Sequence, residues 1–120
     1  MSGQNYRDLI AWRTAMDLVE AIYKVSLGFP KEEVYGLIAQ IRRAVVSIPS
    51  NIAEGQGRGS NKEFQRFLHI AHGSLREVET QLAIAVRLGF VTADDVRTAD
   101  SLCEQAGRVI NGLLRHLNQN

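Results

Sequence analysis

The sequence lacks several features that would indicate particular classes of protein. Cys103 is its only cysteine, so a disulfide within the chain is impossible and a zinc site built from several cysteines is excluded. Its apolar runs are only a few residues long, whereas a membrane-spanning helix needs about 20 apolar residues. Residues 1–6 also lack the apolar core of a signal peptide. We therefore expect a cytoplasmic protein without a membrane partner, in which Cys103 is a buried, inert thiol.

A strong excess of charge of one sign is also missing. The net charge is only +1, which gives no overall argument for binding nucleic acid. Hydrophobic residues make up 45% of the sequence and charged residues 22%, and these proportions are those of a globular protein rather than a disordered one. Because a chain of this length can bury one continuous core, we predict a single domain over 1–120.

Apolar residues in the first half recur at intervals of three and four, which places their side chains on one face of a helix. They predict a first helix over Asp8–Leu27 and a second that begins at Pro30, bends at Pro49 and ends at the glycines of 55–59. The predicted core residues are Leu9, Trp12, Met16, Val19 and Tyr23 in the first helix, and Val34, Leu37, Ile41, Val45, Ile48 and Ile52 in the second.

Capping motifs mark the starts of two further helices. Ser60 and Glu63 predict a capping box, in which the hydroxyl and the carboxylate bond free backbone amides. Gly89 offers a C-terminal cap to this third helix, and Thr92–Asp95 an N-terminal cap to the fourth. The predicted core residues are Phe64, Phe67, Ala71, Leu75, Val78, Leu82 and Ala85 in the third helix, and Val96, Ala99, Cys103, Ala106, Ile110, Leu113 and Leu117 in the fourth. With no competing strand pattern, the sequence predicts an all-α fold, an antiparallel up-down-up-down four-helix bundle.

The apolar faces of the first and third helices are wider than one seam requires. The additional apolar residues are Ile10, Leu18 and Val25 in the first helix, and Leu68, Ile70, Ile84 and Leu88 in the third. Either the bundle buries a broad face of each helix, or part of these faces forms contacts between copies of the chain. Self-association is the hypothesis that we carry forward.

Polar residues follow two lines at the same helical spacing. They are Gln40, Ser47, Asn51 and Glu54 on the second helix, and Ser74, Glu77 and Gln81 on the third. If the lines face each other, they form a buried hydrogen-bond network. Arg43 would then pair with Glu77 or Glu54, because an unpaired buried charge is strongly unfavourable. A ligand pocket is the alternative.

Basic residues are concentrated in the middle of the chain. Residues 40–76 hold six of them against two acidic residues, and the six are Arg42, Arg43, Arg58, Lys62, Arg66 and Arg76. They could form a stripe that binds the RNA or DNA backbone, and an oligomer would repeat it. The alternative is a set of scattered surface arginines, since the neighbours Arg42 and Arg43 cannot both point the same way.

Other motifs predict no chemistry. His69 and His72 are neighbours on a helix surface, but neither has the glutamate three residues before it that di-iron bundles use, so no metal site is expected. The glycines of 55–60 lack the preceding strand and the Gly-Lys-Ser/Thr ending of a phosphate loop, which favours a simple turn. Glu54 and Glu77 have no acid-base context, and no histidine stands at a suggestive spacing from a nucleophile. We therefore expect no catalytic residues, no cofactor and no enzyme.

Several short strings occur together in one order along the chain. They include Phe29-Pro30, Tyr35-Gly36-Leu37, Arg42-Arg43-Ala44, Ser47-Ile48-Pro49, Asn51-Ile52-Ala53-Glu54-Gly55 and Gly73-Ser74-Leu75. With them, nearly the whole chain resembles the four-helix-bundle protein family first associated with intervening sequences in bacterial large-subunit ribosomal RNA genes. The resemblance implies a homopentamer of antiparallel bundles. It also implies kinship with the accessory bundle protein of diversity-generating retroelements, which binds a reverse transcriptase and nucleic acid.

We therefore hypothesise a non-enzymatic oligomeric bundle that binds RNA, DNA or a nucleic-acid-processing protein such as a reverse transcriptase. The alternative is a purely structural or protein-interaction scaffold. A continuous positive patch on the surface would favour the first hypothesis, and its absence the second.

Overall fold

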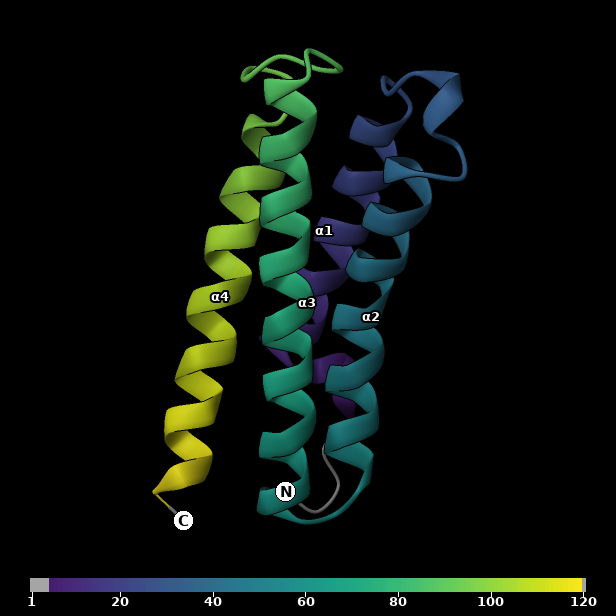
Figure 1. The fold of residues 1–120 in the computed structure, drawn as a ribbon. Helices are drawn as coiled ribbons and strands as arrows, with labels where there is room; N and C mark the ends of the chain where they lie inside the picture. Colours follow the sequence, from purple (N-terminus) through teal and green to yellow (C-terminus); the bar gives the residue numbers. More distant parts are fainter. Residues whose placement is uncertain (1–4, 120) are drawn as a thin grey trace.

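The computed structural model describes residues 5–119, and in this range the chain forms four long α-helices that pack side by side (Figure 1). The helices are α1 (Ile10–Ser26), α2 (Leu37–Gly57), α3 (Asn61–Arg87) and α4 (Arg97–Asn118). Two short 3-10 helices, η1 (Tyr6–Asp8) and η2 (Lys31–Glu33), precede α1 and α2. The α1–α2 and α3–α4 connections lie at one end of the bundle and the α2–α3 connection at the other, so consecutive helices run antiparallel (Figure 1). The predicted all-α four-helix bundle is confirmed.

The core is one continuous cluster of apolar side chains from all four helices. The predicted core faces of α2, α3 and α4 are confirmed, with Phe64 and Leu113 only partly buried and Val34 half exposed. The sulfur of Cys103 belongs to this core, as predicted. Among the helices of residues 5–119, none combines the length and the apolar character that a bilayer-spanning segment requires.

The core face of α1 differs from the prediction. Its buried residues are Ala11, Ala15, Leu18, Ile22 and Ser26. The predicted seam lies on the flank of the helix instead: Leu9, Trp12, Met16 and Val19 are only partly buried, and Tyr23 is exposed. The true stripe lies between the two apolar lines that the sequence suggested. Two of its five residues are alanines and one is a serine, and these give a weaker apolar signal than the large residues beside them.

The second helix also begins later than predicted. Pro30 is followed by η2 and a turn at 34–36, and α2 starts only at Leu37. The Glu33 carboxylate accepts a hydrogen bond from the Leu37 amide at 3.0 Å, so it caps α2 from within this turn. A side chain at Gly36 would come within 2.8 Å of that carboxylate. The turn leaves Val34 half exposed and Tyr35 95% exposed.

Helix α2 continues through Pro49 without interruption, as predicted, whereas the bend there stays a prediction. It also passes through the first glycines, and the chain reverses at Gly59, whose φ is +82°. Gly55 lies inside the helix, where an added Cβ would be only 2.6 Å from the Phe67 Cβ. The missing side chain therefore allows α2 and α3 to approach closely near their connection.

Capping contacts define both ends of the α3–α4 connection. Thr92 and Asp95 bond each other reciprocally, through the Thr92 amide and the Asp95 carboxylate at 2.9 Å and the Asp95 amide and the Thr92 hydroxyl at 3.1 Å. The bonds from Thr92 lower the pKa of Asp95. Gly89, with φ +76°, ends α3, and the Phe90 amide returns to the Ala85 carbonyl at 2.9 Å. The cap at Gly89 agrees with the prediction. Thr92–Asp95, by contrast, closes only the turn before α4, because the helix starts at Arg97 and its N-cap residue Val96 makes no side-chain capping bond.

Candidate functional site

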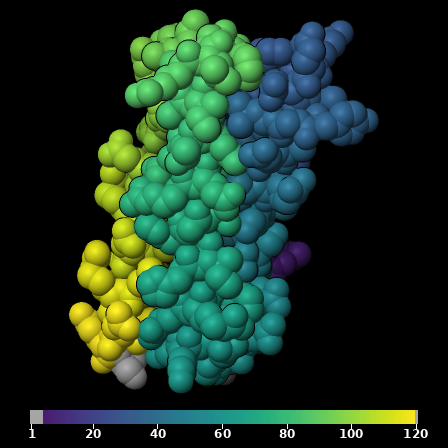
Figure 2. Space-filling model, in the orientation of Figure 1, coloured from purple at the N-terminus to yellow at the C-terminus, as the bar shows by residue number. Residues whose placement is uncertain are grey.

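Polar side chains of α2 and α3 line a groove on the outside of this helix pair. The groove has a volume of about 460 Å³ and is lined by Gln40, Arg43, Ala44, Ser47, Ser74, Glu77 and Gln81. The two helices lie next to each other along this side of the molecule, α2 in blue to teal and α3 in teal to green (Figure 2). The two predicted polar lines therefore do face each other, and we call this surface the α2–α3 groove.

Hydrogen bonds between side chains cross the groove. The hydroxyl oxygens of Ser47 and Ser74 are 2.9 Å apart, and one hydroxyl donates a hydrogen bond to the other. The Asn51 amide group donates to the Ser47 carbonyl at 2.8 Å and to its hydroxyl at 2.9 Å. Gln81 donates to Gln40 over a longer distance of 3.5 Å. The Asn51 bonds lie within α2. The Ser47–Ser74 and Gln81–Gln40 bonds join α2 to α3 and fix their register, because sliding one helix along the other would separate these partners.

One buried polar atom of the groove has no partner. Gln81 is only 9% exposed, and its Oε1 atom makes no hydrogen bond with any residue in 5–119. Turning the amide around would leave Nε2 in the same position, so one of its two polar atoms stays unpaired in either orientation. A buried polar group in this state costs about 1–3 kcal/mol. The predicted network is thus only partly satisfied within one chain.

The predicted ion pairs of Arg43 are not formed. Glu54 pairs with Arg58 at 2.8 Å, whereas Arg43 and Glu77 lie exposed at the groove and make no ion pair within the described chain. The prediction assumed that these charges are buried and must be neutralised. In the structure they are solvated, so nothing forces them together.

The basic residues point in several directions rather than along one line. Arg42 faces α1, where its Nε donates to the Ser26 hydroxyl at 2.9 Å and its guanidinium lies 4.5 Å from the centre of the Tyr23 ring. Arg43 lines the groove on the other side of α2. Arg42 and Arg43 therefore diverge, as predicted. Arg76 pairs with Glu79 on α3 at 2.7 Å.

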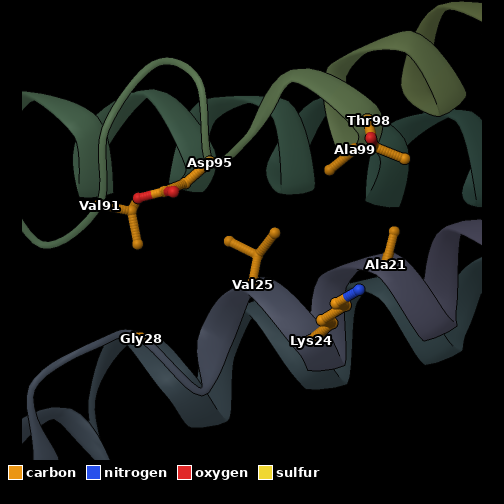
Figure 3. Close-up of a pocket in the computed structure, with 8 residues that line it drawn as sticks. All are labelled: Ala21, Lys24, Val25, Gly28, Val91, Asp95, Thr98 and Ala99. Carbon is orange, nitrogen blue, oxygen red and sulfur yellow. The ribbon is translucent and has the colours of Figure 1, made fainter.

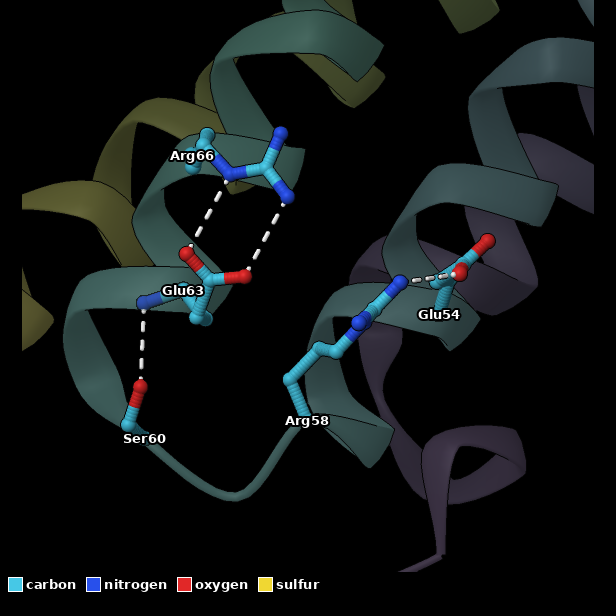
Figure 4. A network of polar contacts seen from close by, with 5 residues as sticks. All are labelled: Glu54, Arg58, Ser60, Glu63 and Arg66. Atoms are coloured by element: carbon cyan, nitrogen blue, oxygen red, sulfur yellow. Dashed lines mark hydrogen bonds and ion pairs between the residues drawn. The ribbon is translucent and has the colours of Figure 1, made fainter.

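Arg58 and Arg66 gather where α2 connects to α3, and each meets a carboxylate (Figure 4). Arg58 bonds Glu54 at 2.8 Å, and Arg66 makes two bonds of 3.2 Å to Glu63. Both guanidiniums also lie over the Phe67 ring, 5.1 and 4.5 Å from its centre. The bond from Arg66 lowers the pKa of Glu63. These arginines thus carry little uncompensated charge.

The start of α3 shows why Glu63 is available to Arg66. The Ser60 hydroxyl accepts a hydrogen bond from the Glu63 amide at 3.2 Å, which is one half of the predicted capping box. The Glu63 carboxylate turns to Arg66 instead of reaching back, so only this half of the box is confirmed (Figure 4). Lys62, exposed beside this cluster, makes no ion pair in the part of the chain that is described.

The titratable side chains elsewhere do not assemble into a reactive site. In residues 5–119 no three histidine, cysteine or carboxylate side chains are grouped so that they could hold a metal ion. Burial lowers the pKa of His72, which disfavours its charged form. Burial also raises the pKa of the Cys103 thiol to about 12. The thiolate is therefore scarce at neutral pH, and Cys103 is a poor nucleophile.

Sequence reasoning found the polar lines but missed two features of the site. The contact of Arg42 with α1 joins residues sixteen positions apart, and helical spacing within one segment carries no signal for it. The exposed turn that holds Tyr35 was also missed, although the pair Tyr35-Gly36 before an apolar helix start could have indicated a break.

Residues 7–112 match a protein-family model described as 23S rRNA-intervening sequence protein. The match covers all of α1, α2 and α3 and most of α4. No curated protein matches the chain. The predicted resemblance to this family is confirmed, whereas the kinship with the retroelement accessory protein stays a prediction.

Proposed function

We propose that this chain, which belongs to the 23S rRNA-intervening sequence protein family, is a non-enzymatic subunit of a homo-oligomer and uses the α2–α3 groove as a contact surface between copies. The observation that carries the proposal is the unpaired Oε1 atom of Gln81, buried in the wall of the groove. Arg43 and Glu77 add two opposite charges that have no partner in the described chain. A second copy that covers the groove can supply a donor for the amide and counter-charges for the other two residues.

Apolar side chains of α3 support the same surface. Ile84 lines a hollow of about 320 Å³ that adjoins the groove and also contains Gln40, Glu77 and Gln81. Ile70, Glu77 and Ile84 are spaced seven residues apart, so they lie on the same face of α3. Ile70, Ile84 and the nearby Leu88 are all exposed. Exposed apolar side chains with polar groups beside them are typical of a contact surface between proteins.

The oligomer is a pentamer in this proposal, as the resemblance to the family implies. A closed ring of five copies needs heterologous contacts, in which one surface of a subunit binds a different surface of its neighbour. The α2–α3 groove is one of the two surfaces, and the neighbour's contribution must come from elsewhere on the bundle.

Native mass spectrometry and sedimentation at micromolar concentration test the proposal. We expect five copies for the wild type, and for Ile84→Glu an association at least about 30-fold weaker, as for a hot-spot residue. Ala83→Glu is the matched control, because it adds the same charge one residue away at an exposed position that points to the α4 side of α3. An exclusively monomeric wild type, or equal weakening by both substitutions, overturns the proposal.

A second candidate function, binding of the RNA or DNA backbone, is favoured by Lys62, an exposed central basic residue outside the α2–α3 groove that has no ion pair in residues 5–119. A ring would repeat this charge in every copy. We expect gel retardation of RNA or DNA at low salt that is lost at high salt, and weakened by Lys62→Glu. Absence of retardation at low salt would rule out this candidate and leave the scaffold.

A further inference from the structure

A hollow of about 390 Å³ lies between α1 and the segment that leads into α4 (Figure 3). Its apolar lining comes from Ala21 and Val25 on α1 and from Val91 and Ala99 on the opposite side. Val91 and Ala99 are themselves buried. An apolar cavity of this size is large enough for one aromatic side chain.

Two charged side chains at the hollow, Asp95 and Lys24, differ in the contacts that they already make. The Asp95 carboxylate already accepts a hydrogen bond from the Thr92 amide at 2.9 Å. Lys24, which also lines the hollow, is exposed and makes no ion pair in the described residues. One hydrogen bond does not neutralise a carboxylate, so Asp95 keeps its negative charge and a second oxygen that can accept from a hydroxyl. The hollow therefore combines apolar side chains with one unpaired cation and one free acceptor, which fits a tyrosine that has a carboxylate next to it.

The turn before α2 presents such a pair of side chains. Tyr35 is 95% exposed, and Glu32, three residues before it, is exposed without an ion pair in 5–119. Two hydrogen bonds of 3.0 Å hold the turn. The Leu37 amide donates to the Glu33 carboxylate, and the Gly36 amide donates to the Glu33 carbonyl. In the space-filling view the blue segment around this connection projects from the bundle (Figure 2). A tyrosine on a rigid turn loses little conformational entropy when it binds.

We propose that Tyr35 of one copy inserts into the hollow between α1 and α4 of the next copy, with Glu32 facing Lys24 across the contact. This inference rests on the proposed function and names the second surface that a ring requires. The turn and the hollow lie at the same end of the bundle, where α1 connects to α2 and α3 to α4 (Figure 1). Copies that stand side by side with parallel axes therefore bring the two together at the same height.

Charge exchange between the two sides tests the contact. Measured by sedimentation at a series of concentrations, Tyr35→Ala weakens association by at least about 30-fold, as expected for a buried aromatic anchor. Lys24→Glu and Glu32→Lys each place like charges opposite one another and weaken association by about 10-fold or more, and the double variant restores it. Asp17→Lys, at an exposed acidic position on α1 about two turns before Lys24, is the control and leaves association unchanged.

Far-UV circular dichroism of each variant separates loss of contact from loss of fold, and none of the substituted side chains belongs to the core. If the wild type assembles but Tyr35→Ala and Lys24→Glu assemble equally well, this inference is wrong and the proposed function stands. If the wild type is monomeric, both fail.

A photo-crosslinking residue placed at position 35 gives a second, independent readout. We expect crosslinks from one copy to the peptides that contain Val25 or Val91 of another. Crosslinks only to other peptides would contradict the contact. Association that is unaffected by position 35 but changed by a small apolar compound would assign the hollow to a small molecule instead, and would equally overturn the inference.

Discussion

The inner and outer sides of the α2–α3 pair differ in how completely their side chains find partners within one chain. On the inner side, Ile41, Ile48, Leu75 and Leu82 are almost completely removed from water, so folding of one chain completes this side. On the outer side, a buried amide oxygen of Gln81 has no partner in the described chain and apolar residues of α3 are exposed. Folding of one chain thus satisfies the inner side of these two helices, whereas the outer side keeps unpartnered groups and is the surface that we propose for association. Six substitutions on α2 and α3 test how much each side depends on folding.

The largest effect is expected for a core truncation compared with an outer one. Leu75→Ala should lower the free energy of unfolding by about 2–5 kcal/mol, because it removes buried methyl groups and leaves a cavity. Ile84→Ala should lower it by less than about 1 kcal/mol when association is kept small by dilution. Urea unfolding followed by circular dichroism measures both. Equal losses would show that the outer side is already part of the fold.

A second comparison concerns the closest approach of α2 and α3. Gly55→Ala should cost about 1–3 kcal/mol of the free energy of unfolding through overpacking, since its Cβ would lie 2.6 Å from the Phe67 Cβ. Gly57→Ala is the matched control, because nothing lies within 4 Å of its added Cβ. It should stabilise the protein by up to about 1 kcal/mol through helix propensity. If both variants change the free energy of unfolding in the same direction, the close contact between Gly55 and Phe67 does not explain the effect of Gly55→Ala.

A smaller effect is expected where a polar group is buried without a partner. Gln81→Met keeps the length of the side chain and removes the amide, so the free energy of unfolding should stay level or rise by up to about 1 kcal/mol. At the same time, association between copies should weaken, because the donor offered by a neighbour loses its acceptor. Thermal unfolding and sedimentation give the two readouts. A clear loss of stability in the monomer would mean that the amide is satisfied within one chain.

The smallest effect is expected at the exposed ion pair of Glu63 and Arg66. Arg66 holds the pKa of Glu63 below its ordinary value of 4.5. The pair therefore stabilises the fold above that pH, and this contribution is lost as the pH falls through the lowered pKa. Glu63→Gln should shift the urea midpoint slightly at pH 7 and not at about pH 3. A larger shift of the urea midpoint at the acidic pH than at pH 7 would contradict the lowered pKa of Glu63.

Most of the helix faces could be predicted, because the core residues of α2, α3 and α4 recur at helical spacing. The core face of α1 was predicted wrongly for a physical reason. Ala11 and Ala15 face the core, and small side chains contribute little to an apolar pattern. The start of α2 was misplaced because Glu33 favours a helix N-terminus, and here it acts as a cap from a preceding turn.

The candidate site was predictable only where it depends on spacing within a helix. The facing polar lines follow from such spacing, and Ser47 and Ser74 meet as expected. The failure of Arg43 to pair with Glu77 depends on exposure, and the position of Arg42 depends on a contact with another helix. Neither is encoded in the local pattern of one segment.

The order of contacts along the chain has a consequence for the kinetics of assembly. Helices α1 and α2, α2 and α3, and α3 and α4 are neighbours in sequence, whereas the packing of α1 against α4 joins the two ends of the chain. Contacts between distant segments carry the largest loop-closure cost, so we expect the α1–α4 contact to form late in folding. The hollow that Lys24 and Val91 help to line would then exist only in a completed bundle, so in the ring that we propose, partly folded chains could not take part in the contact at the hollow.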